Sequence, residues 1–147
     1  MARLHGDLTP WVVSSTTEAR RHGVRLHEQI TEGALGAAIE VHGILGPGLL
    51  ESAYEECLAH EFRLRKIEFH RQVALPISYK GILLDCGYRM DFVVEAEVVV
   101  ELKCVERILA VHEAQLFTYL RLTRKRVGLL LNFNAPVLRD GIVRRIL

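Results

Sequence analysis

The sequence predicts an α/β fold in which a mixed β-sheet of four to five strands is flanked by helices. Apolar residues recur at helical spacing in the N-terminal part of the chain, and at every second position in several short runs that follow. A further helical segment then leads to a continuous apolar strand. A helical crossover after a meander of strands places antiparallel and parallel strands in one sheet.

Two helices are expected before the first strand. The first pattern of spaced apolar residues begins near Leu26 and includes Ile30 and Val41. The glycine-rich run 43–48 should end this helix, because glycine and proline interrupt helical structure. A second apolar stripe predicts a helix over about residues 49–65.

The pattern then changes to that of strands and one more helix. Short runs rich in β-branched residues are typical of strands that are half buried or fully buried. Pro76 indicates the end or the edge of one strand, because proline cannot donate to a sheet. The expected strands are 69–77, 79–84, 88–94, 98–104, 127–133 and 141–147, with a helix over 112–122.

We expect a single domain over residues 27–147, preceded by a partly ordered tail or arm over residues 1–26. The arm mixes Ser, Thr, Arg and His with little periodicity, and Pro10 interrupts it. We expect no signal peptide and no membrane span, and three scattered cysteines predict neither a disulfide framework nor a zinc ribbon. These features indicate a cytoplasmic protein with no membrane partner.

Charge is balanced overall but uneven along the chain. The formal net charge of +1 by itself implies no partner. From Arg121 to the end, seven basic residues accompany one acid, Asp140. A basic end suits a nucleic-acid partner, although charged surfaces also serve solubility alone. If nucleic acid binds, the basic residues of 121–126 should flank the cleft and contact phosphates.

The most informative stretch carries Asp91 in one expected strand, and Glu101 and Lys103 near the end of the next. Side chains two apart in a strand share a face, so Glu101 and Lys103 should project together. A hairpin between the strands would bring Asp91 opposite Glu101. Two carboxylates and a backbone carbonyl, such as that of Leu102, form a suitable site for Mg²⁺ or Mn²⁺. A lysine beside that site could stabilise charge on a phosphate, which is the chemistry of phosphodiester hydrolysis.

An isolated Glu-x-Lys has a simpler explanation, because this tripeptide often occurs by chance. In that interpretation Glu101 and Lys103 form a salt bridge at the edge of the sheet, and Asp91 caps a turn. A metal site and a structural ion pair are therefore both compatible with these residues alone.

Two further pairs lie on the expected helices. Glu51 and Tyr54 are three apart and share a face, so Glu51 could join the metal ligands or remain a solvated acid at the helix start. Gln115 and Tyr119 are four apart and also share a face. They could fix the nucleophile and the substrate phosphate, or be an exposed amide and a core aromatic residue.

These residues form four motifs in a fixed order: Gly48-x-x-Glu51-x-x-Tyr54, the later Asp91, Glu101-x-Lys103 and Gln115-x-x-x-Tyr119. Together they resemble the GxxExxY family, which is assigned to the PD-(D/E)xK nuclease superfamily. The resemblance extends from about Ile30 to the C-terminus. It departs at Met90, where the superfamily name expects proline, and the chain has too few cysteines for the iron–sulfur cluster of some RecB-type relatives.

The resemblance implies the αβββαβ core of the superfamily and a metal-dependent nuclease. The Q-x-x-x-Y motif is similar to that of RecB-type and lambda-exonuclease-like members, which favours processing of DNA ends over restriction-type cleavage. The resemblance implies that Asp91 and Glu101 ligate the metal and that Glu51 is the acidic residue of the leading helix. It also implies that Lys103 is the catalytic lysine. Gln115 and Tyr119 then occupy the Q-x-x-x-Y positions.

We therefore expect a deoxyribonuclease that depends on Mg²⁺ or Mn²⁺, with exonuclease action favoured. Because the chain is nearly all core, sequence specificity would come from a homodimer or from a partner protein. One alternative is a weakly active or inactive nucleic-acid-binding module on the same fold, although no acid or lysine is missing. Another is an unrelated α/β protein with a phosphate loop at 46–48, which lacks the Lys-Ser/Thr ending of a P-loop.

Overall fold

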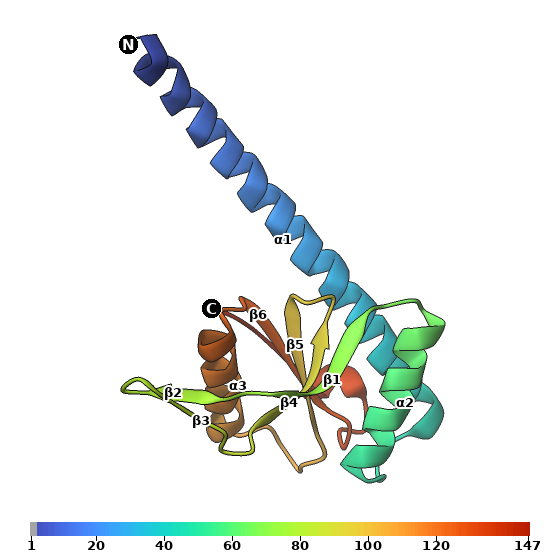
Figure 1. Ribbon diagram of the computed structural model, residues 1–147. Helices are drawn as coiled ribbons and strands as arrows, with labels where there is room; N and C mark the ends of the chain where they lie inside the picture. The colour runs from blue at the N-terminus through green and yellow to red at the C-terminus, as the bar shows by residue number, and fades with distance from the viewer. Residues whose placement is uncertain (1–2) are drawn as a thin grey trace.

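The computed structural model describes the backbone of residues 3–147 and the side chains of residues 20, 21, 23–25 and 27–147. It contains a five-stranded mixed sheet with helices on both faces (Figure 1). The elements are α1 (Arg3–Leu45), α2 (Glu51–Leu64), β1 (Phe69–Ala74), β2 (Ile77–Tyr79), β3 (Ile82–Leu84), β4 (Arg89–Val94), β5 (Val98–Lys103), α3 (Ala110–Thr123), β6 (Val127–Asn132), the 3₁₀-helix η1 (Leu138–Gly141) and β7 (Ile142–Ile146).

The strand order in the main sheet is β1-β4-β5-β6-β7. β1, β4 and β5 form an antiparallel meander, and α3 then crosses over so that β6 lies parallel to β5. β7 closes the sheet antiparallel to β6. From α2 to β6 the chain therefore follows the predicted αβββαβ order, which confirms the α/β fold class.

Two apolar clusters cover the two faces of the sheet. One lies between the sheet and helices α1 and α2 and includes Phe92, Val100 and Leu129. The other lies between the sheet and α3 and includes Val99 and Leu130. Figure 1 shows α3 on one side of the sheet and α2 on the other. All six residues of β6 are buried, which explains why its sequence is a continuous apolar run.

Helix α1 begins much earlier than the apolar periodicity predicts. It starts at Arg3, passes through Pro10 and ends at Leu45, and its N-terminal part extends away from the sheet (Figure 1). Among the side chains that the structure describes, its buried apolar residues start at Ile30, just after His27, which contacts Glu97 at 3.3 Å. Periodicity therefore marked the part of α1 that packs, and the helix itself continues beyond it. The division at residue 26 into an arm and a domain stays a prediction, and residues 1–2 lie outside the described residues.

The expected strand over 69–77 ends at Ala74, and the next residues form a separate hairpin. Among the strands that the structure describes, β2 and β3 pair with each other and not with the main sheet. Lys80 and Gly81 join them with φ angles of 47° and 82°. Two positive φ values fit a type I′ turn, the connection that suits tight hairpins.

In the described part of the chain, no helix is both long enough and apolar enough to cross a membrane.

We expect Gly128→Ala to destabilise the domain, because α3 packs directly on the bare backbone of β6 at this position. A Cβ atom there would lie 2.6 Å from Cδ1 and 3.0 Å from Cγ of the buried Leu116. Overpacking of this kind costs about 1–3 kcal/mol, which urea denaturation would measure. Gly43→Ala is the control: nothing lies within 4 Å of its added Cβ, so stability should stay or rise. Equal stability of both variants would contradict the close packing of α3.

Candidate active site

The two central strands β4 and β5 separate where the acidic residues lie. Their ladder ends with the pair of Phe92 and Val100. Beyond it, the Asp91 backbone N–H donates to Glu101 Oε1 at 2.9 Å, and the Leu102 N–H donates to Asp91 Oδ2 at 2.8 Å. Each carboxylate thus accepts a hydrogen bond that a ladder carbonyl would otherwise accept. This exchange holds both carboxylates in the gap between the strands.

Burial perturbs both acids. Glu101 is only 5% exposed, and burial together with the neighbouring Asp91 carboxylate raises the pKa of Glu101 to about 9. Burial also raises the pKa of Asp91, against the opposing effect of the hydrogen bond from the Leu102 N–H. Adjacent carboxylates in a poorly solvated place disfavour each other's ionised form. A cation in the gap would reverse this effect.

Helix α2 brings Glu51 toward the same region. Glu51 is the first residue of α2, and its pKa is raised by partial burial and then by the charge of Asp91. Tyr54 holds the helix start: its hydroxyl donates to the Gly46 carbonyl at 2.5 Å and accepts from the Leu49 N–H at 3.2 Å. Its ring stacks on Phe133 at 4.6 Å. Tyr54 is thus a structural residue that fixes where Glu51 lies.

Lys103, Gln115 and Tyr119 form a chain of contacts between β5 and α3. Lys103 Nζ donates to Gln115 Oε1 at 3.4 Å, and Gln115 Nε2 donates to the Tyr119 hydroxyl at 2.8 Å. Burial and then the charge of Glu101 raise the pKa of Tyr119. The structure therefore brings together the lysine and the Gln-x-x-x-Tyr residues that the sequence singled out.

The simpler interpretation, in which Glu101 and Lys103 form a salt bridge and Asp91 caps a turn, does not describe the contacts of these residues. Among the described residues, Lys103 has no ion pair with Glu101, and Asp91 lies within β4 instead of capping a turn. The N–H of Leu102 points to Asp91, and the carbonyl of a strand residue points to the same side as its N–H. The Leu102 carbonyl therefore also faces the gap.

The donor set suits a hard divalent cation. Within the described residues, no group of three or more His, Cys, Asp or Glu side chains is arranged to hold a metal ion. Magnesium, however, commonly binds through one or two carboxylates and keeps several waters. Asp91, Glu101 and the Leu102 carbonyl supply oxygens of that kind in a gap where, among the described residues, neither carboxylate has an ion-pair partner. The residues present therefore fit Mg²⁺ or Mn²⁺.

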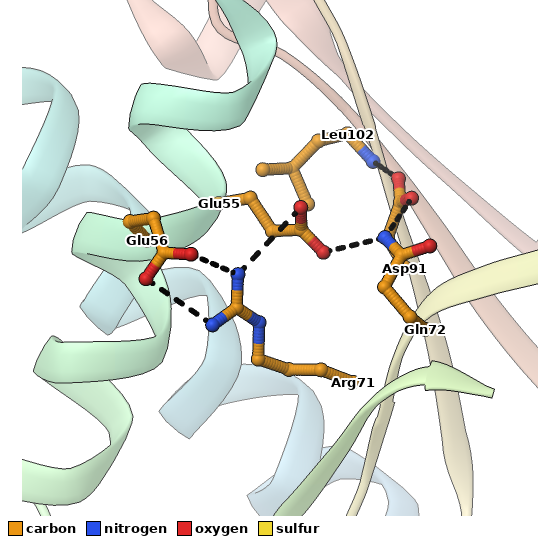
Figure 2. A network of polar contacts seen from close by, with 6 residues as sticks. All are labelled: Glu55, Glu56, Arg71, Gln72, Asp91 and Leu102. Carbon is orange, nitrogen blue, oxygen red and sulfur yellow. Dashed lines mark hydrogen bonds and ion pairs between the residues drawn. The ribbon is translucent and has the colours of Figure 1, made fainter.

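Three polar residues at this site were not singled out from the sequence. Glu55 and Gln72 contact each other, and Gln72 also contacts Asp91 (Figure 2). Glu55 follows Glu51 by four residues, so helical spacing could have found it. Gln72 has a φ of 49°, and no sequence pattern signals it. The buried Asn132 exchanges hydrogen bonds with the backbone of Val105 at 2.8 and 3.1 Å and thus anchors the chain after Lys103.

The expectation that basic residues of 121–126 flank the cleft is wrong. Arg121 lies in the last turn of α3, and the others follow that helix and precede β6, whose first residue Val127 pairs with Val98 at the far end of β5 from Lys103. Lys125 Nζ donates to the Ala96 carbonyl in the β4–β5 turn. The crossover must return the chain to the start of the next parallel strand, so it carries these charges away from the site.

A family model described as the PD-(D/E)XK nuclease superfamily matches residues 28–146. The chain belongs to this superfamily. No curated protein and no solved structure matches it. Membership in the PD-(D/E)XK nuclease superfamily indicates a nuclease with a nucleic acid as substrate, and such nucleases typically use divalent metals. The five-stranded mixed sheet between helices agrees with this assignment.

We expect the metal-free PD-(D/E)XK domain to lose stability as pH rises. The pKa of Glu101 is raised from 4.5 to about 9 in the folded state, so the folded state binds this proton more tightly than the unfolded state. The unfolding free energy should therefore fall between about pH 5 and pH 9. Glu101→Gln should flatten this fall and gain about 1–3 kcal/mol at pH 8. Asp91 and Glu51 would leave a residual slope of the same sign.

Urea denaturation in EDTA at several pH values measures this effect. At pH 5 the variant and the wild type should be nearly equally stable, because the wild-type Glu101 is then protonated when folded. A Glu101→Gln variant that is less stable at pH 8, with an unchanged pH slope, would contradict the unfavourable burial of the Glu101 carboxylate.

Proposed function

We propose that the protein is a deoxyribonuclease that requires Mg²⁺ or Mn²⁺ and hydrolyses phosphodiester bonds. The observation that carries the proposal is the exchange of hydrogen bonds between Asp91, Glu101 and Leu102, with Lys103 on the adjoining strand end. Asp91, Glu101 and the Leu102 carbonyl would hold the metal. Glu51 would act as an additional acid from α2.

A divalent ion held there would lower the pKa of a bound water and neutralise charge on the scissile phosphate. Lys103 would donate to the phosphate or to the attacking water from the edge of the acidic pair. Gln115 holds the Lys103 ammonium, and Tyr119 holds Gln115, so the direction of the lysine is determined by α3. Charge stabilisation and orientation are the two contributions that this chemistry requires.

We further propose that the protein belongs to the GxxExxY group. The conformation of the chain supports a structural reason for each motif position. Gly48 has a φ of 103°, which a residue with a Cβ adopts only under strain. The hydroxyl of Tyr54 holds the turn around Gly48 by its hydrogen bond to the Gly46 carbonyl. Glu51, which lies between Gly48 and Tyr54 in the sequence, is the first residue of α2. The motif therefore combines a turn, an acid and the residue that closes the turn.

For the substrate, we propose DNA with cleavage from ends, by the similarity of Gln115 and Tyr119 to the Q-x-x-x-Y motif. Arg89 and Arg107 are exposed on segments at the Lys103 end of the sheet, where phosphates could meet them. A homodimer or a protein partner would supply sequence specificity, since nearly all of residues 27–147 forms the core domain. We place its action in the cytoplasm.

Digestion of linear, nicked circular and single-stranded DNA with Mg²⁺ or Mn²⁺ tests the nuclease activity. We expect the wild type to degrade linear DNA, and Lys103→Ala and Glu101→Gln to lose about 10²-fold or more in rate. Lys125→Ala is a matched control, because this lysine lies at the opposite end of the sheet and should keep full activity. Resistance of the covalently intact strand in nicked circles would support cleavage from ends.

Activity that survives in Lys103→Ala and Glu101→Gln would overturn the catalytic assignment. A wild type that is inert on every substrate with both metals, but binds DNA, would favour the binding module on the same fold. Circular dichroism of each variant must match that of the wild type, so that a loss of activity reports on chemistry.

Metal binding gives a second prediction with a readout other than cleavage. Mn²⁺ should raise the unfolding free energy of the wild type by about 2.7 kcal/mol at a hundred times its dissociation constant. Asp91→Asn and Glu101→Gln should show little of this stabilisation, because each removes a carboxylate from the gap. Equal stabilisation of all three proteins in urea denaturation would place the metal elsewhere.

A further inference from the structure

We propose that Gln72 is a positioning residue for Asp91, and that Glu55 anchors Gln72. This inference rests on the proposed metal-dependent function and adds two residues to it. Gln72 Nε2 lies 2.6 Å from Glu55 Oε1 and 3.4 Å from Asp91 Oδ1 (Figure 2). One amide nitrogen therefore joins the helix α2 to the carboxylate on β4.

Each carboxylate oxygen of Asp91 then accepts one hydrogen bond. Oδ2 accepts from the Leu102 N–H, and Oδ1 accepts from Gln72. One contact alone would leave the carboxylate free to rotate about the bond to Cβ. Two contacts from different strands fix the plane of the group, and Figure 2 shows Asp91 between these two donors. A ligand held in this way presents its remaining lone pairs in one direction.

The backbone of β1 is shaped to place Gln72 there. Gln72 lies between the pairs Arg71–Phe92 and Val73–Met90, so it stands opposite Asp91. Its φ of 49° lies in the left-handed region, which a residue other than glycine rarely adopts. Arg71 lies over the Phe92 ring on the α2 side, and Val73 packs on the α3 side. Arg71 and Val73, which would share a face in a regular strand, thus point to opposite faces of the sheet, so the alternation of side chains is reversed at Gln72.

Glu55 is itself held by Arg71. The Arg71 guanidinium makes a two-pronged contact with Glu56, at 2.8 and 3.2 Å, and its Nη2 lies 3.7 Å from Glu55 (Figure 2). This positive charge compensates Glu55, which remains available to accept from Gln72. The neutral amide separates Glu55 from Asp91, two carboxylates that would otherwise repel each other.

Gln72→Asn tests the inference, because asparagine keeps the amide and tolerates positive φ but is one methylene shorter. It can no longer span Glu55 and Asp91. We expect the calorimetric dissociation constant for Mn²⁺ to rise about tenfold, since loss of a partner behind a metal ligand typically costs 10–100-fold. The Mn²⁺ concentration for half-maximal cleavage should rise equally, with the KM for DNA and the thermal stability near wild type.

Three variants of α2 separate positioning from direct ligation. Glu55→Ala should weaken Mn²⁺ binding as Gln72→Asn does. Glu55→Gln should retain wild-type affinity, because its amide oxygen can still accept from Gln72, whereas a metal ligand would lose its charge. Glu56→Ala is the matched control: Glu56 contacts Arg71 but neither Gln72 nor Asp91, so affinity should not change.

Wild-type Mn²⁺ affinity in Gln72→Asn would overturn the proposal, and so would loss of affinity in Glu55→Gln. A wild type that binds Mn²⁺ but cuts no DNA would refute the nuclease activity alone, since the calorimetric comparison would still decide the role of Gln72. A wild type that binds no Mn²⁺ would refute both.

Discussion

The structure depends on the point at which β4 and β5 separate. Two backbone N–H groups, of Asp91 and Leu102, lose their ladder partners there and take carboxylate oxygens of Glu101 and Asp91 in their place. A buried N–H without an acceptor is strongly unfavourable, so both carboxylates are drawn into the gap. The hydrogen bonds that complete the sheet thus also create a buried acidic pair with raised pKa values. The same two hydrogen bonds therefore satisfy the backbone of the sheet and hold the carboxylates where a cation could bind them.

The surrounding elements determine what this pair can do. The α3 crossover sets β6 parallel to β5, and Phe133 N–H donates to the Lys103 carbonyl at 2.9 Å just past that ladder. Lys103 is thereby fixed at the end of the sheet, where α3 offers Gln115. On the other face, the turn closed by Tyr54 starts α2 close enough to the acids that partial burial and then the charge of Asp91 raise the pKa of Glu51. The two helices approach the gap from opposite faces of one sheet.

Sequence periodicity identified candidate site residues whose side-chain direction follows from regular strand or helix geometry. Strand alternation was enough to predict that Glu101 and Lys103 share a face, and helical spacing was enough to predict the same of Gln115 and Tyr119. It could not find Gln72, because a positive φ inside a strand breaks the alternation on which the reasoning depends. It misplaced the basic residues of 121–126, because their position follows from the direction of the crossover and not from local pattern. Their charge was visible in the sequence, whereas the end of the sheet they occupy was not.

The placement of nearby cations explains how the acidic pair can remain available to a metal. Arg71 is bound by Glu56 and Glu55, so its guanidinium is directed toward α2. Lys103 contacts the neutral Gln115 and, among the described residues, makes no ion pair with Glu101. The side chain that does touch Asp91 from β1 is the uncharged amide of Gln72. A guanidinium at that position would neutralise Asp91 internally and compete with any external cation. The chain instead supports the carboxylate with neutral donors, which orient it without forming an ion pair.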